Sequence, residues 1–162
     1  MKLLALLFCF TLTAALHAQT APSPPPLLEA SATFFALSVA DVDSSARWYS
    51  EKLGLKVVMR NPRTVETKSA MVLLQGGGLT VELVQHDEAV PLRSFIPTPR
   101  GSLYVHGIFK VGVTVENFDS GIATLRSRGV SIPIGPFPKR GDQPANAIIQ
   151  DNAGNYIQIF GK

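Results

Sequence analysis

A glutamine within a hydrophobic strand is the first side chain that raises a chemical question. The C-terminal stretch AIIQDNAGNYIQIF contains two apolar runs separated by a five-residue turn. Successive side chains of a strand point to opposite faces, so Tyr156, Gln158 and Phe160 share one face and Ile157 and Ile159 share the other. An amide in this position is either hydrogen-bonded at the margin of a sheet or part of the lining of a cavity.

A glutamate occupies the matching position of an earlier stretch. MVLLQGGGLTVELV can be aligned with AIIQDNAGNYIQIF at a separation of 76 positions, which places Gly78 on Gly154 and Glu82 on Gln158. A carboxylate can accept a proton in catalysis or pair with a cation. Glu82 is therefore a candidate general base or a candidate partner of a cation.

A second pair of segments obeys the same separation and indicates an internal repeat. FFALSVADVDSSARWYSEKLGL and FKVGVTVENFDSGIATLRSRGV both begin with strand-like alternation and change to helical spacing. The side chains expected to cap the helices are Asp43 or Ser44 in the first copy and Asp119 and Ser120 in the second. Gly54 and Gly129 are the expected helix stops. The chain therefore contains two copies of one unit, a strand, a helix and a set of strands closed by a glycine-containing turn.

The composition is that of a globular protein. The chain has 162 residues, of which 46% are hydrophobic and 17% are charged, and this length can bury a substantial core. The formal net charge of +3 is too weak to indicate nucleic-acid binding. The sequence contains no phosphate-binding loop, nucleotide fingerprint or Ser-His-Asp signature.

The N-terminus has the pattern of an export signal. Residues 1–18 combine a lysine, an apolar stretch and a small residue before the expected cleavage point, which predicts a signal peptide and a secreted or periplasmic protein without a stable membrane anchor. Residues 19–31 are proline-rich and are expected to form a linker. The single domain is then expected over 32–162, with modules at about 33–86 and 106–160. Because Cys9 lies within the signal, the mature chain can form no disulfide.

The repeat and two motifs resemble the vicinal oxygen chelate superfamily. The motifs are the strand and helix entry of FALSVADVDSSARWYSEKLGLKVV and the DNAGNYIQIF turn and strand. This superfamily includes glyoxalase I, extradiol dioxygenases and the bleomycin and fosfomycin resistance proteins. The resemblance implies an α+β fold, in which two tandem βαβββ modules form a curved half-open barrel around a central cavity. An α+β domain of two layers without a cavity is the alternative that periodicity does not exclude.

The resemblance also implies which four side chains face the cavity. In members that use a metal, the ligands come from the first and last strands of each module, and the matching positions here are Phe34, Glu82, Lys110 and Gln158. Phenylalanine supplies no donor and a lysine ammonium repels a cation, so no metal and no other cofactor are expected. Lys110 could pair with Glu82 across the cavity or extend into solvent, and the sequence favours neither.

Three functions follow from these positions. The first is the binding of a small organic molecule without a metal, as in the bleomycin-resistance proteins. The second is a glyoxalase-like lyase or isomerase, or a degenerate dioxygenase relative, in which Glu82 is a general base and Lys110 stabilises an oxyanion. The third is a structural role, with the cavity filled by the protein's own side chains. The resemblance further implies a homodimer.

Overall fold

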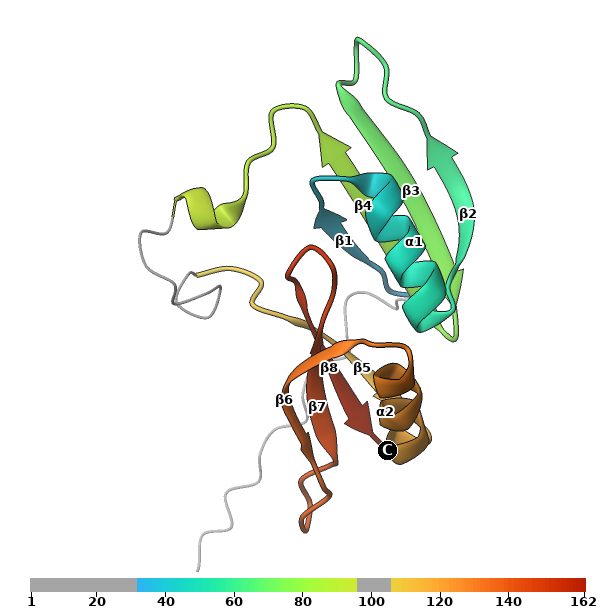
Figure 1. Ribbon diagram of the computed structural model, residues 1–162, viewed down its shortest axis with the longest axis vertical. Coiled ribbons are helices and arrows are strands. Elements are labelled where there is room, and N and C mark those ends of the chain that lie inside the picture. The colour runs from blue at the N-terminus through green and yellow to red at the C-terminus, as the bar shows by residue number, and fades with distance from the viewer. Residues whose placement is uncertain (1–31, 96–105) are drawn as a thin grey trace, which may run out of the picture. The chain divides into compact units, whose positions relative to one another are not determined.

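Two modules of the same architecture make up the described part of the chain. The computed structural model describes residues 32–95 and 106–162, so the predicted signal peptide and the whole predicted linker lie outside the described residues. The first module contains β1 (Phe35–Ser38), α1 (Val42–Leu53), β2 (Lys56–Asn61), β3 (Ser69–Gly76) and β4 (Leu79–His86), followed by the 3-10 turn η1 (Leu92–Ser94). The second contains β5 (Val111–Val115), α2 (Phe118–Ser127), β6 (Ser131–Phe137), β7 (Asn146–Gln150) and β8 (Tyr156–Gly161) (Figure 1).

Each module forms its own four-stranded mixed sheet. The strand orders are β1-β4-β3-β2 and β5-β8-β7-β6, so β1 and β5 are edge strands that pair in parallel with β4 and β8. Neither sheet closes on itself. The predicted α+β fold of two tandem βαβββ modules in a half-open arrangement is thereby confirmed.

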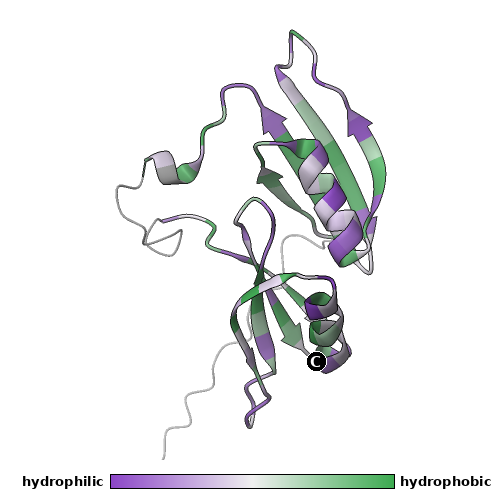
Figure 2. Ribbon diagram, viewed as in Figure 1, coloured by the Kyte–Doolittle hydropathy of each residue, from purple (hydrophilic) through white to green (hydrophobic). Residues whose placement is uncertain are grey.

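The alternation of the sequence decides which face of each sheet is buried. In β4, Val81 and Leu83 are fully buried, whereas Glu82 between them is half-buried on the other face. In β8, Ile157 and Ile159 are buried and Gln158 is half-buried, as the period of two predicts. The buried aliphatic residues form one hydrophobic cluster with residues from α1 and α2. Figure 2 shows hydrophobic residues along much of β3 and polar residues over much of α1.

The expected helix caps are wrong by a few positions. Asp41, with extended backbone angles, caps α1 by accepting hydrogen bonds from the backbone N–H groups of Asp43 and Ser44 at 3.0 and 2.9 Å. Asn117 takes the same place before α2, and its side chain makes no capping hydrogen bond. The predicted caps lie two or three positions further on, within the first turn, where the backbone is already helical: Asp43, Ser44, Asp119 and Ser120. Gly54 ends α1 in the left-handed conformation, as predicted, with φ at 76°.

The repeat alignment also needs a correction at the final hairpin. Glu82 pairs with Leu73, and Gln158 pairs with Ile148, so the equivalent of Leu73 is Ile148 and not Ile149. The two hairpins differ because the β3–β4 turn is closed by Gly77 and Gly78 alone, both with positive φ, whereas five residues join β7 to β8. The separation of 76 therefore holds for β4 and β8 but falls to 75 for β3 and β7.

No helix within the described ranges is long and apolar enough to cross a membrane.

Candidate functional site

A cavity of about 550 Å³ lies where the start of β1 and the β3–β4 turn meet β5. Its volume falls within the usual range for small-molecule sites. The residues that line it are Thr33, Phe34, Phe35, Gly77, Gly78, Leu79, Thr80, Val111, Gly112, Val113, Thr114 and Val115. None of these residues carries an ionisable side chain. Apart from the backbone, the polar groups of this described lining are three threonine hydroxyls.

Phe34 is the predicted site residue that lines this cavity. Phe34 immediately precedes β1 and is 64% exposed. Within the described lining it is joined by Leu79 and the valines of β5. The ring therefore offers a flat apolar surface at the cavity wall.

Glu82 lies in the middle of β4, on the face opposite α1. Its neighbours in register are Ala36 on β1 and Leu73 on β3. The carboxylate makes no ion pair, and no side-chain hydrogen bond, with any residue of the described ranges. Glu82 is half-buried and has no side-chain partner among the described residues, but it does not line the cavity.

Lys110 directly precedes β5 and is exposed. Its ammonium nitrogen lies 5.5 Å from the centroid of the Phe109 ring, within the range of a cation–π contact. The four ion pairs found among the described residues do not join Lys110 to Glu82. Of the two arrangements that the sequence left open, the structure has the lysine at the surface.

Gln158 is a hydrogen-bonded amide on the sheet face opposite α2. It pairs in register with Gly112 of β5 and Ile148 of β7, and its side-chain Nε2 donates to Oδ1 of Asn146 at 3.3 Å. This hydrogen bond explains why a polar residue is tolerated in the strand, as expected for an amide at the margin of a sheet. Its role as a cavity residue, like those of Glu82 and Lys110, stays a prediction.

The contribution of β5 to the cavity was not predicted from the sequence. Five consecutive residues of this strand, Val111–Val115, line it together with Thr80 from β4. The available signal was the glycine in VGVTV, because a residue without a side chain in a β-rich segment often marks a close approach to the backbone.

The metal that the fold family uses does not fit the residues of this chain. Glu82 is the one good ligand among the four corresponding positions, since Phe34 has no donor atom and Lys110 carries a positive charge. Across the residues that the structure describes, no three His, Cys, Asp or Glu side chains come close enough to hold a metal ion. These side chains therefore give no support for a reaction step at a bound metal ion.

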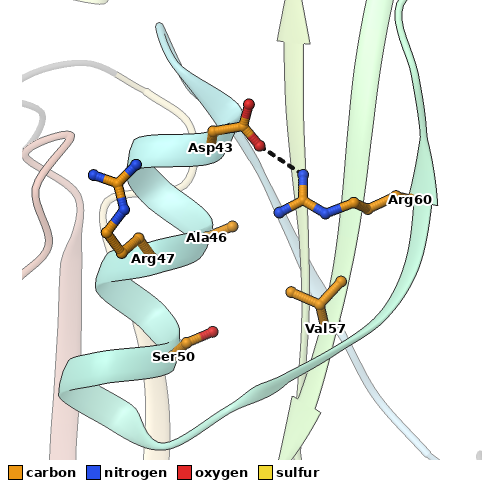
Figure 3. A pocket seen from close by; sticks show the side chains of 6 residues that line it. All are labelled: Asp43, Ala46, Arg47, Ser50, Val57 and Arg60. Carbon is orange, nitrogen blue, oxygen red and sulfur yellow. Dashed lines mark hydrogen bonds and ion pairs between the residues drawn. The ribbon is translucent and has the colours of Figure 1, made fainter.

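A second hollow, of about 340 Å³, lies between α1 and the edge strand β2. The residues that line it are Asp43, Ala46, Arg47, Ser50, Val57 and Arg60 (Figure 3). Asp43 accepts a hydrogen bond from Arg60 at 2.6 Å, and Figure 3 shows Arg47 extending to the other side of the helix. Both members of the ion pair are largely exposed, so this hollow has neither the enclosure nor the converging groups of a ligand site.

A buried tyrosine and a carboxylate connect the two modules. The hydroxyl of Tyr49, on α1, donates to Oδ2 of Asp151, in the β7–β8 turn, at 2.9 Å. The carboxylate also accepts hydrogen bonds from Ala153 N at 2.9 Å, Asn155 N at 2.8 Å and Asn155 Nδ2 at 2.9 Å. Burial, and then the negative charge of Asp151, raises the pKa of Tyr49 far above its ordinary value. The Tyr49 phenol therefore stays protonated, and the pair is a structural connection and not a source of protons.

The two βαβββ modules and their edge-strand cavity define a protein of the vicinal oxygen chelate fold. A family model, the glyoxalase/bleomycin resistance protein/dioxygenase superfamily, matches residues 31–159. The chain belongs to this superfamily. A comparison with curated proteins found no match.

Solved structures of several functional kinds share the fold. A glyoxalase/bleomycin resistance protein/dioxygenase domain from Frankia sp. EAN1pec is 20% identical, with a TM-score of 0.63, and the match covers 83% of this chain and 93% of that one. The antibiotic binding protein TnmS3 from Streptomyces sp. CB03234 is 19% identical, with a TM-score of 0.59 and coverage of 84% and 98%. A mutant glyoxalase I from Zea mays is 18% identical, with a TM-score of 0.57 and coverage of 77% and 42%. At these identities the likeness establishes the fold alone.

Proposed function

We propose that this protein is exported and binds a small organic molecule without a metal. The observation that supports this function most directly is the cavity beside Phe34, which has an exposed aromatic ring, aliphatic walls and no ionisable side chain in its described lining. A cavity that combines apolar side chains with a few polar groups is a usual form of a small-molecule site. TnmS3, which shares the fold, is an antibiotic binding protein.

The test is calorimetric titration of the purified protein with a panel of compounds, among them bleomycin in its metal-free and copper-loaded forms. We expect a saturable heat for at least one panel member and recovery of that compound unchanged by mass spectrometry. Phe34→Ala should weaken the binding, because it removes the exposed ring from the cavity wall. Phe95→Ala is the matched control, since this ring is 70% exposed but is not part of the described lining. No saturable heat with any compound would contradict the proposal.

Glu82 supports a second candidate, a glyoxalase-like isomerase. Its half-buried carboxylate makes no side-chain hydrogen bond to any described residue and is therefore available as a base. In such a reaction the carboxylate would take a proton from the carbon next to a carbonyl group and return it to the neighbouring carbon. Conversion of the hemithioacetal of methylglyoxal and glutathione, followed by ultraviolet absorbance and abolished in Glu82→Gln, would favour this candidate over binding alone.

Export and dimerisation are part of the same proposal. Residues 1–18 support export through their signal-like pattern, and N-terminal sequencing of the protein from cell fractions would locate the cleavage point. Exposed apolar side chains on the edge strand β2, Val57, Val58 and Met59, support a homodimer. Light scattering that gives the mass of a single chain at tens of micromolar would contradict the dimer.

A further inference from the structure

The cavity faces the edge of β5 and not only one of its two faces. Side chains alternate along a strand, so a cavity beside one face meets every second residue. Here all five residues of Val111–Val115 line it. The backbone of the strand edge is therefore exposed to the cavity.

Two of the five residues of β5 point their backbone polar groups toward that edge. β8 is the only strand that pairs with β5 in the described chain, and Lys162 N donates to the carbonyl of Val115 at 3.1 Å. The N–H and C=O of one residue of a strand point to the same side, and the side alternates from residue to residue. Val111, Val113 and Val115 therefore face β8, whereas Gly112 and Thr114 present their N–H and C=O groups to the cavity. None of the described residues hydrogen-bonds to these groups.

The remaining lining determines what can satisfy those groups. A charged ligand would enter a site without an ionisable partner in its described lining and would lose hydration without compensation. A secondary amide is uncharged and has one donor and one acceptor, as each strand residue has. Gly112 has no side chain to obstruct its approach. An extended amide can therefore add to β5 as a further strand would.

We infer that the cavity takes an uncharged compound with a secondary amide in an extended conformation. The amide binds the free N–H and C=O groups of Gly112 and Thr114, and the apolar substituents of the compound pack against Phe34 and Leu79. This inference rests on the proposed small-molecule function and names its ligand class. Peptide-like compounds with N-acylated, uncharged ends fit this description.

The direct test uses N-acetylleucine N′-methylamide as the probe, with amide resonances of the full-length protein followed by NMR. We expect saturable shifts at Gly112 and Thr114, and at least tenfold slower hydrogen exchange of both N–H groups at saturation. The matched control is the same compound methylated on both nitrogens, which keeps the carbonyls but has no N–H donor. It should bind about tenfold more weakly or worse, because the carbonyl groups of the edge lose their donor.

Two substitutions at one position test the protein side. Gly112→Pro removes an N–H that faces the cavity and is not used by β8, a placement that an edge strand tolerates. Gly112→Ala keeps the N–H and adds a methyl group with no contact closer than 3.8 Å. We expect Gly112→Pro to weaken probe binding about tenfold and Gly112→Ala to change it less than threefold. Unfolding midpoints show whether the proline variant folds. If it does not, the comparison of the probe with its methylated form on the wild-type protein tests the inference.

Three results would overturn the inference, and the first two separate its failure from that of the proposed function. In the first, other compounds bind and shift only amide resonances on the Glu82 face, while the probe shifts neither Gly112 nor Thr114 up to about 10 mM. The small-molecule function would then stand, but the secondary-amide ligand class would be excluded. An absence of saturable binding by the probe and by every member of the calorimetric panel would remove both. Equal affinity for the amide and its methylated form would also overturn the inference.

Discussion

Lys52 and Arg128 each donate a side-chain hydrogen bond to the other's backbone carbonyl. Arg128 Nη1 donates to the carbonyl of Lys52 at 2.8 Å, and Lys52 Nζ donates to the carbonyl of Arg128. The two residues are 76 positions apart, which is the separation of the internal repeat. Each is therefore the counterpart of the other, and the two hydrogen bonds join equivalent positions at the C-terminal ends of α1 and α2.

The Tyr49–Asp151 connection breaks this symmetry. The counterpart of Tyr49 in the second module is Leu125, which has no hydroxyl group, so the buried hydrogen bond occurs once. Tyr49→Phe should lower the free energy of unfolding by about 2 kcal/mol, because a buried carboxylate loses one of its four hydrogen bonds. Denaturant unfolding measures this change. Tyr156→Phe is the control, since Tyr156 is half-buried and its hydroxyl has no hydrogen bond to a described residue. Equal losses for both variants would contradict the assignment.

The same tyrosine should make stability fall at alkaline pH. Its pKa in the folded state lies above the ordinary tyrosine value of 10.0, so above pH 10 the unfolded chain releases a proton that the folded chain retains. The contribution of Tyr49 is therefore fully present below pH 10 and lost as the pH rises, by about 1.4 kcal/mol per pH unit. The measurement is the difference in unfolding free energy between the wild type and Tyr49→Phe from pH 8 to about 11. A difference that does not depend on pH would show that the phenol titrates normally.

The two helix starts provide a matched comparison of capping. Asp41→Ala should cost about 1 kcal/mol, because Asp41 Oδ1 accepts from two N–H groups at the start of α1. Asn117→Ala should cost less than about 0.5 kcal/mol, because the side chain of Asn117 makes no capping bond. Chemical denaturation of both variants decides the point, and a larger loss at Asn117 would refute it.

The sequence predicted the repeat because its two copies share one hydrophobic pattern and one set of turn residues. It did not locate the helix caps, because Asp41, Asp43 and Ser44 all have side chains that can cap, and the choice depends on which residue has the extended backbone angles. The register of the final hairpins was also missed by one position. Turn length sets that register, and an alignment without a gap cannot express a two-residue turn opposite one of five.

The free edge of β5 could not be predicted for a different reason. Strand pairing joins segments far apart in the chain, such as Gly112 and Gln158. The alternation in VGVTV indicates a strand but not how many partners it has. The four site positions came from the family resemblance, and of these only Phe34 is in the described lining of the cavity.

Metal content is a further prediction. The purified protein should contain much less than one transition metal per chain, because Phe34 and Lys110 replace ligands at two of the four positions. Elemental analysis measures this, with thermal unfolding in zinc, nickel and manganese salts as the second observation. We expect no rise in the melting temperature with any of them. One tightly held metal ion per chain would overturn the residue assignments.

The last prediction concerns Glu82 and Lys110, which form no ion pair in the structure. Because Lys110 is exposed and lies over the Phe109 ring, Glu82→Gln leaves no buried ammonium without a partner. The substitution should therefore change the free energy of unfolding by less than about 1 kcal/mol, and Lys110→Met should add its own small effect independently. A double-mutant cycle by denaturant unfolding should give a coupling below about 0.5 kcal/mol. A coupling of about 2 kcal/mol or more would show that the two charges meet in solution, and the proposed uncharged cavity would then need an ionic neighbour.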